Sequence, residues 1–416
     1  MRVFLIMFFL FFSCTVEKNF LIEDFSKINS KIDKYIDDGS LALLHVYLED
    51  INGSPIYSYS KVNDSLLDNN IDENTWFRIW SMSKIVTISI AMDLVEEGII
   101  SLDDNVSDYF PELQNLKIAK GPNGENLNQW SSKDLCPLTF EKVDYKMTVL
   151  DLINHKAGFF YSTTNHKCLN ELVAWKNLAS SIDTNDFIER ISQLPLIQKP
   201  GDKAFYGTNT TILGMLCEKA TGKTLNQLLN EKLITPFNLK GFAYNKDNDV
   251  NLLPVFSGVD SLIRKATKGE LDIFGQDVPS YEPNNKLFLG GEGMISTTNG
   301  YADFLRILLN DGSLDNVRFL DKSTILEMSS PHTQINEYGH NGYNLWVTGE
   351  KVRQDGYGDS GLWTGGGYEG THFWIDRKRK FVGLIMTQVF SPNKKASNKD
   401  NEIRGLIYNE IFKNEN

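Results

Sequence analysis

Segments with the pattern of β-strands occur at both ends of the chain, and helical patterns fill the residues between them. Near the N-terminus the apolar run Leu41–Leu48 precedes Asn52-Gly53, a pair that suits a tight hairpin turn before a returning strand at Pro55–Ser60. Further strands are expected at Tyr343–Val347, Thr371–Ile375 and Phe381–Thr387. This order favours a mixed α/β (α+β) fold, in which one antiparallel sheet gathers both chain ends and is flanked by helices.

The middle of the chain is expected to form an inserted helical lobe. The helical patterns are Val149–Asn154, Asp186–Gln193, Thr210–Ala220, Leu225–Leu233 and Tyr301–Leu309, with a last helix at Asn401–Phe412. Residues 116–146 are polar and rich in turn-forming residues, so we expect them to form a long excursion of the chain and not a separate domain. The sequence shows no internal repeat or linker that would divide it into two domains.

A serine that could act as a nucleophile stands at the start of the first strong helical pattern. Lys84 stands three positions after Ser81, so the two side chains would share one face of a helix. The apolar helix that begins here is expected to end near Gly98, with charged residues such as Asp93 facing water. A serine becomes a nucleophile when a base lies within hydrogen-bond reach, and a helix N-terminus favours developing negative charge. The spacing therefore predicts that Lys84 activates Ser81, although a plain helix cap would need only the serine.

Two other serines have a lysine at the same distance. Ser58 precedes Lys61 within an expected strand, and Ser391 precedes Lys394 in a charged stretch that contains Pro392. Neither opens an apolar helix. Ser81 is therefore the preferred nucleophile.

The residues around Ser81 resemble the nucleophile region of the superfamily of class C β-lactamases, serine DD-peptidases and related esterases. The matching strings, in chain order, are FRIWSMSK at 77–84, GIISLDD at 98–104, MTVLDLINHKAG at 147–158 and GGEGMIST at 290–297. The resemblance covers about residues 30–412, which we treat as one hydrolase domain. It implies a β-lactamase/transpeptidase-like fold and hydrolysis of an ester or amide through an acyl-enzyme on Ser81, without cofactor or metal.

By this resemblance, Tyr206 is the second member of the catalytic base. It follows Pro200-Gly201, as the family tyrosine follows its Pro-Gly, and its phenol near Lys84 would shuttle the proton of Ser81. The family pattern Tyr-x-Asn is altered here, because Asn209 stands one place late. That shift puts amide-type substrate recognition in doubt. His155 lies where the family also tends to carry a histidine with a structural role.

The third family motif, Lys-Thr-Gly or His-Thr-Gly on an inner strand, is represented by Trp363, Thr364 and Gly365. The resemblance implies that the Gly366 N–H joins the Ser81 N–H as an oxyanion donor. Because Trp363 stands where a cation usually binds a substrate carboxylate, esterase-like activity is favoured over peptidase or β-lactamase activity. The glycine run allows the strand to be aligned in more than one register.

The N-terminus has the pattern of an export signal. Arg2 and a short apolar run precede Ser13-Cys14, which resembles a bacterial lipoprotein processing site. We expect residues 1–13 to be a signal peptide, Cys14 to carry lipid, and the protein to reach the cell envelope with the lipid as its membrane contact; simple signal cleavage is the alternative. Cys136 and Cys168 could form a disulfide there, which the sequence leaves open, and Cys217 should be a buried thiol.

The remaining function classes are limited by charge. A net charge of −12 argues against nucleic acid as a partner, because phosphate binding needs a basic surface. The expected partner is instead a small-molecule ester, amide or peptide-like substrate. A non-catalytic binding or sensor protein in the envelope is the rival from another class, and the altered second and third motifs favour it. Ser81, Lys84 and Tyr206 together argue against it.

Overall fold

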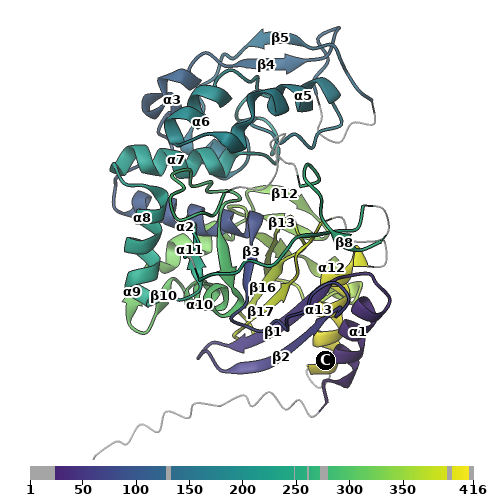
Figure 1. Cartoon of the computed structure of the whole chain (residues 1–416). Helices are drawn as coiled ribbons and strands as arrows, with labels where there is room; N and C mark the ends of the chain where they lie inside the picture. Colours follow the sequence, from purple (N-terminus) through teal and green to yellow (C-terminus); the bar gives the residue numbers. More distant parts are fainter. Residues whose placement is uncertain are drawn as a thin grey trace, which may run out of the picture.

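An antiparallel eight-stranded sheet forms the centre of the protein, in the strand order β12-β13-β14-β15-β16-β17-β1-β2 (Figure 1). The structure, a computed structural model, describes residues 24–127, 133–247, 249–259, 262–271, 280–390 and 396–411. The strands of the sheet are β1 (Leu43–Asp50), β2 (Pro55–Val62), β12 (Thr333–Asn336), β13 (Gly339–Asn341), β14 (Trp346–Thr348), β15 (Trp363–Gly366), β16 (His372–Asp376) and β17 (Phe381–Met386).

The two ends of the chain meet in this sheet. Strand β1 pairs with β2 through the expected hairpin, and on its other edge it pairs antiparallel with β17, with Val46 opposite Ile385. The predicted fold class is thereby confirmed. One strand boundary was wrong, because β14 begins at Trp346 and the residues before it, including Asn344 with φ 54°, form a turn.

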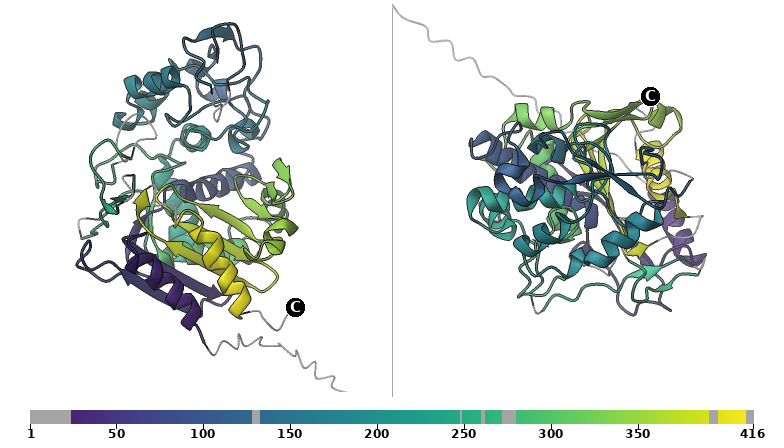
Figure 2. Two further views of the ribbon diagram at one scale, coloured as in Figure 1. Left: turned by 90° about the vertical axis from the view of Figure 1, so that its right-hand side faces the viewer. Right: turned by 90° about the horizontal axis from the view of Figure 1, so that it is seen from above.

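Helices cover both faces of the sheet. On one face, α1 (Ser26–Asp37) and α13 (Lys399–Ile411) lie side by side (Figure 2), and Arg404 of α13 contacts His372 of β16. On the opposite face, α10 (Thr298–Leu309) packs against β16 and β17, with Tyr301 against Phe373. Because neighbouring residues of a strand point to opposite faces, His372 and Phe373 mark the two sides of the sheet.

The nucleophile helix α2 (Ser83–Glu96) is buried between the sheet body and α7 (Asn209–Thr221). Its residues from Ser83 to Leu94 are all buried. The predicted wet side was therefore wrong at Asp93, which is 8% exposed and pairs with Lys232 Nζ at 2.8 Å. The ion pair is the physical reason that a carboxylate is tolerated there, since a buried charge needs a partner.

The inserted lobe lies above the sheet body in Figure 1, between α2 and α7 in the sequence. It contains α3 (Val106–Tyr109), β4 (Lys117–Lys120), β5 (Thr139–Lys142), α4 (Val149–Ile153), α5 (Lys167–Lys176) and α6 (Thr184–Ile191). Beyond it, α8 (Leu225–Leu229) leads into a π-helical turn at Asn230–Ile234 and α9 (Thr235–Phe237). The chain also has short helices at α11 (Lys322–Met328) and α12 (Glu350–Gln354), and short strands at β3 (Trp76–Arg78), β6 (Phe242–Ala243) and β9 (Ile295–Thr297).

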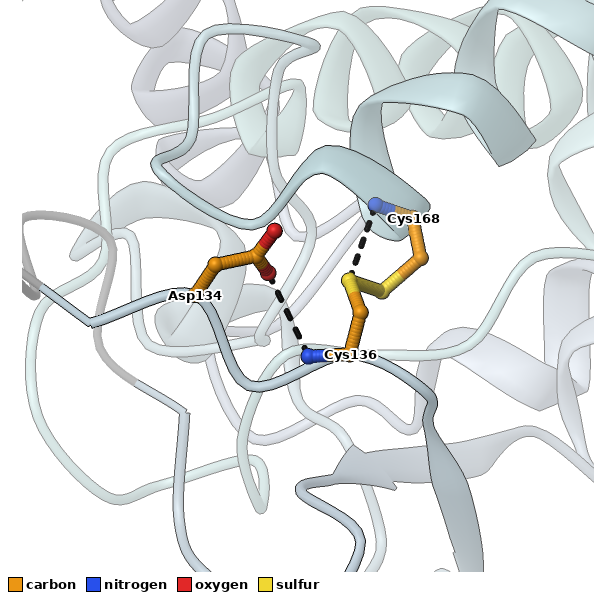
Figure 3. Close-up of side chains that lie close together, drawn as sticks. All are labelled: Asp134, Cys136 and Cys168. Atoms are coloured by element: carbon orange, nitrogen blue, oxygen red, sulfur yellow. Dashed lines mark hydrogen bonds between the residues drawn. A yellow bond between two sulfur atoms is a disulfide. The ribbon is translucent and has the colours of Figure 1, made fainter.

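A disulfide between Cys136 and Cys168 joins the loop before β5 to the start of α5. Asp134 lies beside it and accepts a hydrogen bond from the Cys136 N–H at 3.3 Å (Figure 3). These three residues stand close enough to resemble a metal-binding cluster, but both sulfurs are consumed by the disulfide and offer no thiolate. The cluster is thus structural. Cys217 is a buried free thiol, as predicted.

No helix among the described residues is long and apolar enough to span a membrane. The expected signal peptide and Cys14 lie outside the described residues.

Candidate active site

The position of Ser81 is fixed by contacts on both sides of it. Ser81 lies in a short 3₁₀ turn, Trp80–Met82, which continues into α2 at Ser83. The Gln388 carboxamide bonds both the N–H and the C=O of Arg78 just before this turn, at 2.9 and 3.1 Å. After it, the Tyr301 hydroxyl donates to the Met82 carbonyl at 2.9 Å. The nucleophile is therefore held between the end of the sheet and α10.

Lys84 lies one turn later in α2 and is fully buried. Its Nζ donates to Ser81 Oγ at 3.1 Å, to the Tyr161 hydroxyl at 3.0 Å and to the Gly291 carbonyl at 2.8 Å. An ammonium has three N–H donors, and here each has an acceptor. The Glu292 carboxylate lies 3.5 Å from Nζ and balances the charge. Lys84 is thus buried beneath the cavity and reaches it through its hydrogen bond to Ser81.

Tyr206 completes the contacts of the nucleophile. Its hydroxyl lies 2.6 Å from Ser81 Oγ, and its ring centroid lies 4.8 Å from Lys84 Nζ. Tyr206 is 38% exposed, whereas Lys84 is not exposed at all. The structure therefore brings together the three residues singled out from the sequence, with Tyr206 on the solvent side of Ser81 and Lys84 on the protein side.

Sequence reasoning missed a second buried pair beneath Lys84. Tyr161 donates a short hydrogen bond to Glu292, and Thr211 donates to the other carboxylate oxygen of Glu292 at 2.5 Å. Burial, followed by the Glu292 charge, raises the pKa of Tyr161 well above its ordinary value, so this tyrosine stays a hydroxyl. Glu292 stood inside the GGEGMIST string, but nothing in that string connected its carboxylate to Lys84. Tyr161 carried no signal.

The displaced Asn209 does not reach the cavity. It is fully buried at the start of α7, where its Nδ2 lies 3.1 Å from His155 Nδ1 and 3.3 Å from the Phe205 carbonyl. The His155 ring in turn stacks on Tyr206, with centroids 5.0 Å apart. Burial, and next the charge of Lys84, lower the pKa of His155 to about 3, so the ring is neutral. Both residues support the ring of Tyr206 from behind.

The chain needs glycine directly after Tyr206. A Cβ on Gly207 would lie 2.1 Å from the Phe159 carbonyl oxygen, so the chain passes another backbone segment here without room for a side chain. This close approach lets Tyr206 reach Ser81, while the asparagine that follows is carried into the protein interior.

On strand β15 the structure separates Trp363 from the other three residues of the third motif. Thr364, Gly365 and Gly366 line the cavity at Ser81, and Trp363 is not among the described lining residues. The Trp363 ring is 4% exposed and lies against the Arg377 guanidinium, 4.6 Å from the ring centroid. Trp363 therefore does not line the cavity as the sequence-based interpretation assumed, and Thr364 is the neighbouring side chain of β15 that does.

The backbone of β15 offers a donor to the cavity. Gly367 N–H donates to Thr371 in the turn toward β16 at 2.8 Å, so the alternation of a strand directs the Gly366 N–H to the opposite edge. On that edge the pairing with β14 covers Trp363 and Thr364 and ends before Gly366. The Gly366 N–H therefore points beyond the last β14–β15 pair. Strand β15 also contacts the 3₁₀ turn that carries Ser81.

The cavity at Ser81 has a volume of about 210 Å³ and an uncharged wall. Among the described residues, no lysine, arginine, aspartate or glutamate side chain lines it. Its described lining comes from the nucleophile helix, the Tyr206 loop and strands β12–β16: Ser81, Ile85, His155, Ala204, Tyr206, Gln334, Asn341, Asn344, Trp346, Thr364, Gly365, Gly366 and Phe373. A substrate carboxylate would meet no cationic side chain among these residues.

The two other serines with a lysine three residues later are not at this site. Ser58 lies within β2, the edge strand of the sheet, and β16, β17 and β1 separate that strand from β15 at the cavity. Ser391 lies outside the described residues.

A nucleophile helix held between an antiparallel sheet and an inserted lobe, with serine, lysine and tyrosine in contact, defines a serine-hydrolase site in a β-lactamase/transpeptidase-like fold. The chain belongs to the Beta-lactamase family, whose sequence profile matches residues 42–406.

Two relatives illustrate the range of the family. Protein Rv1367c from Mycobacterium tuberculosis is 26% identical over 286 residues, 67% of this chain and 65% of the relative's own length. A Putative D-alanyl-D-alanine carboxypeptidase from Salmonella agona is 26% identical over 329 residues, 73% of this chain and 68% of that protein. The chain thus spans less than two thirds of the M. tuberculosis relative.

Solved structures show the same fold at lower identity. Simvastatin Synthase (LovD) from Aspergillus terreus has a TM-score of 0.72 at 19% identity, covering 92% of this chain and 98% of that chain. EstCE1, a hydrolase with promiscuous acyltransferase activity, has a TM-score of 0.71 at 16% identity, covering 91% and 97%. At these identities the likeness establishes the fold alone.

Proposed function

We propose that this protein is a serine hydrolase that forms an acyl-enzyme on Ser81 and prefers short, uncharged esters. The observation that carries the proposal is the position of Ser81 Oγ, 3.1 Å from Lys84 Nζ and 2.6 Å from the Tyr206 hydroxyl. A serine that contacts both a cation and a phenol oxygen has the partners that nucleophilic catalysis needs.

In the proposed reaction Tyr206 acts as the phenolate. Ser81 Oγ attacks the ester carbonyl carbon while its proton passes to the Tyr206 phenolate oxygen, which becomes the hydroxyl. The Lys84 ammonium stabilises the negative charge that moves between these two oxygens, since it lies 3.1 Å from Ser81 Oγ and 4.8 Å from the Tyr206 ring centroid. The N–H groups of Ser81 and Gly366 would hold the oxyanion of the tetrahedral intermediate. Tyr206 then returns the proton to the departing alcohol, which leaves the acyl group on Ser81.

Deacylation repeats the same steps with water as the nucleophile. Water donates a proton to Tyr206 as it attacks the acyl carbonyl, and that proton returns to Ser81 Oγ when the carboxylic acid departs. Glu292, Tyr161 and Thr211 do not reach the reacting atoms in this scheme. They hold Lys84 in place.

The preference for uncharged esters rests on the lining of the cavity and no longer on Trp363. A β-lactam or a C-terminal peptide carries a carboxylate near the scissile bond, and the described lining contains no cation to receive it. A D-amino-acid peptidase or β-lactamase on the same machinery is the alternative that this argument disfavours.

The comparison of an aryl acetate with a chromogenic cephalosporin tests this preference. We expect kcat/KM for the acetate to exceed that for the cephalosporin by about tenfold or more, because a missing charge-assisted hydrogen bond costs about 1.5–3 kcal/mol. Both reactions are measured with Ser81→Ala as the control for catalysis by another site. Faster turnover of the cephalosporin would contradict the ester preference.

We further propose that the mature protein begins at a lipid-modified Cys14 in the bacterial cell envelope. The Ser13-Cys14 pattern supports the anchor, and the Cys136–Cys168 disulfide supports an oxidising compartment. Mass spectrometry of the mature N-terminus is expected to find a diacylated or triacylated cysteine, and Cys14→Ala should move the protein from the detergent phase to the aqueous phase. An unmodified N-terminus at another residue would contradict the anchor.

A further inference from the structure

The hairpin strands opposite Ser81 present three neutral carboxamides to the cavity. Gln334 lies in β12, Asn341 ends β13 and Asn344 lies in the turn before β14, and all three line the cavity together with Trp346. The proposed reaction uses none of them. A wall with three carboxamides and an aromatic ring lies in the active site without a role in the chemistry.

The backbone at Gln334 is in an unusual conformation. Gln334 has φ 53°, in the left-handed region that disfavours most residues with a side chain, whereas Asn344, with φ 54°, is a residue type that adopts this region readily. The pairing of β12 with β13 also shifts register between Thr333 and Asn336, around Gln334. Glycine would adopt the Gln334 angle without cost, yet the chain carries a carboxamide there. Strain retained at this cavity-lining residue points to a role for its side chain.

The hydrogen-bonding groups of this wall are all neutral. The Asn344 side chain hydrogen-bonds the neutral His155 ring, whereas Gln334 is exposed and Asn341 is half-buried. Each carboxamide supplies one acceptor oxygen and two N–H donors. An uncharged substrate group that both donates and accepts matches this set.

We propose that the carboxamide wall, formed by Gln334, Asn341 and Asn344, binds the hydroxyl groups of a short-chain acyl ester of a sugar or similar neutral polyol. A hydroxyl both donates and accepts, and adjacent hydroxyls match the paired oxygen and nitrogen of a carboxamide. The Trp346 ring offers an apolar surface to the C–H face of the same sugar. An amide-bearing group is planar and would engage fewer of the three carboxamides.

The size of the cavity agrees with a compact substrate. Its volume of about 210 Å³ lies below the roughly 300–1,000 Å³ that is usual for drug-sized ligands. That volume suits one sugar ring with an acetyl-sized acyl group. This inference rests on the proposed ester hydrolysis at Ser81 and names the substrate class of that site.

The test compares two acetates in the full-length protein, each of a primary alcohol on a six-membered ring: methyl 6-O-acetyl-glucopyranoside, which has free hydroxyls, and cyclohexylmethyl acetate, which has none. We expect kcat/KM for the sugar ester to be about a hundredfold higher or more, because a site built to bond hydroxyls rejects the analogue that lacks them. In Gln334→Leu and Asn341→Leu, the ratio of the two kcat/KM values should fall about tenfold each. Gln354→Leu is the matched control, an exposed carboxamide on α12 outside the cavity lining, and should keep the ratio.

Labelling of Ser81 by a phosphonate shows that each variant is folded, and hydrolysis of an aryl acetate separates the two proposals. A wild-type protein that hydrolyses neither acetate nor the aryl ester contradicts the proposed function itself. One that hydrolyses the aryl ester with no preference for the sugar ester overturns the carboxamide-wall inference alone. A higher rate on an N-acetylated amino-alcohol acetate, lost in Gln334→Leu, would also overturn it in favour of an amide-bearing substrate.

Discussion

Ser81→Ala is expected to remove both phosphonate labelling and ester turnover while leaving the protein folded. The loss in kcat should reach about four orders of magnitude or more, as is usual when the nucleophile is removed from a set of catalytic residues that act as one unit. The side chain is small and lies at the cavity, so its loss creates no buried void. Lys84 keeps two of its three acceptors, the Tyr161 hydroxyl and the Gly291 carbonyl, and its counter-ion Glu292.

Ser58→Ala is the matched control for this experiment. It removes a serine that also has a lysine three residues later, but from strand β2 and away from the cavity. Full labelling and turnover are expected in this variant. Retention of labelling in Ser81→Ala, or its loss in Ser58→Ala, would contradict the assignment of the nucleophile.

The same experiment addresses the rival interpretation, a non-catalytic binding protein that kept the fold. The altered second and third motifs favoured that interpretation. In the structure, the altered residues do not disturb the nucleophile: Asn209 is buried beside His155, and Trp363 lies outside the cavity lining. A protein with no covalent step would show no labelling at Ser81 in the wild type.

Local patterns predicted the elements of this fold well. The period of apolar residues and the Asn52-Gly53 turn identified α2 and the β1–β2 hairpin, because these features act over a few residues. The strands at both chain ends predicted one sheet that gathers them, but not that β1 pairs with β17. The burial of Asp93 could not be predicted, since its partner Lys232 is far away in the sequence.

The site was predictable only where a short motif carried it. Ser81, Lys84 and Tyr206 belong to motifs with recognisable spacing, whereas Tyr161 is brought to Lys84 by the folding of the inserted lobe. The register of β15 depends on its pairing with β14 and β16, which a run of glycines does not encode. The carboxamide wall is formed by residues of β12, β13 and the turn before β14, so its convergence on the cavity appears only in three dimensions.

The second large effect is expected for Tyr206→Phe, which deletes one hydroxyl and keeps the ring between His155 and the cavity. Because the Tyr206 oxygen lies 2.6 Å from Ser81 Oγ, kcat should fall by about two to four orders of magnitude, the usual span for loss of a general base. Tyr161→Phe is the matched control. Its hydroxyl contacts Lys84 Nζ at 3.0 Å and Glu292, so its loss should weaken the position of Lys84 and cost much less.

The coupling between Lys84 and Tyr206 decides whether they act as one unit. Lys84→Met should lower kcat about as much as Tyr206→Phe, and the double variant should lose little more than the worse single change, because groups that act together are not additive. Lys84→Met leaves the buried Glu292 carboxylate without its cation, so it is measured also in a Glu292→Gln background, which keeps the shape of the side chain and removes the charge. The observables are kcat, the rate of phosphonate labelling and the urea midpoint of unfolding. Fully additive losses would mean that lysine and tyrosine serve separate steps, and near-normal turnover in a folded Tyr206→Phe variant would transfer the role of proton acceptor away from Tyr206.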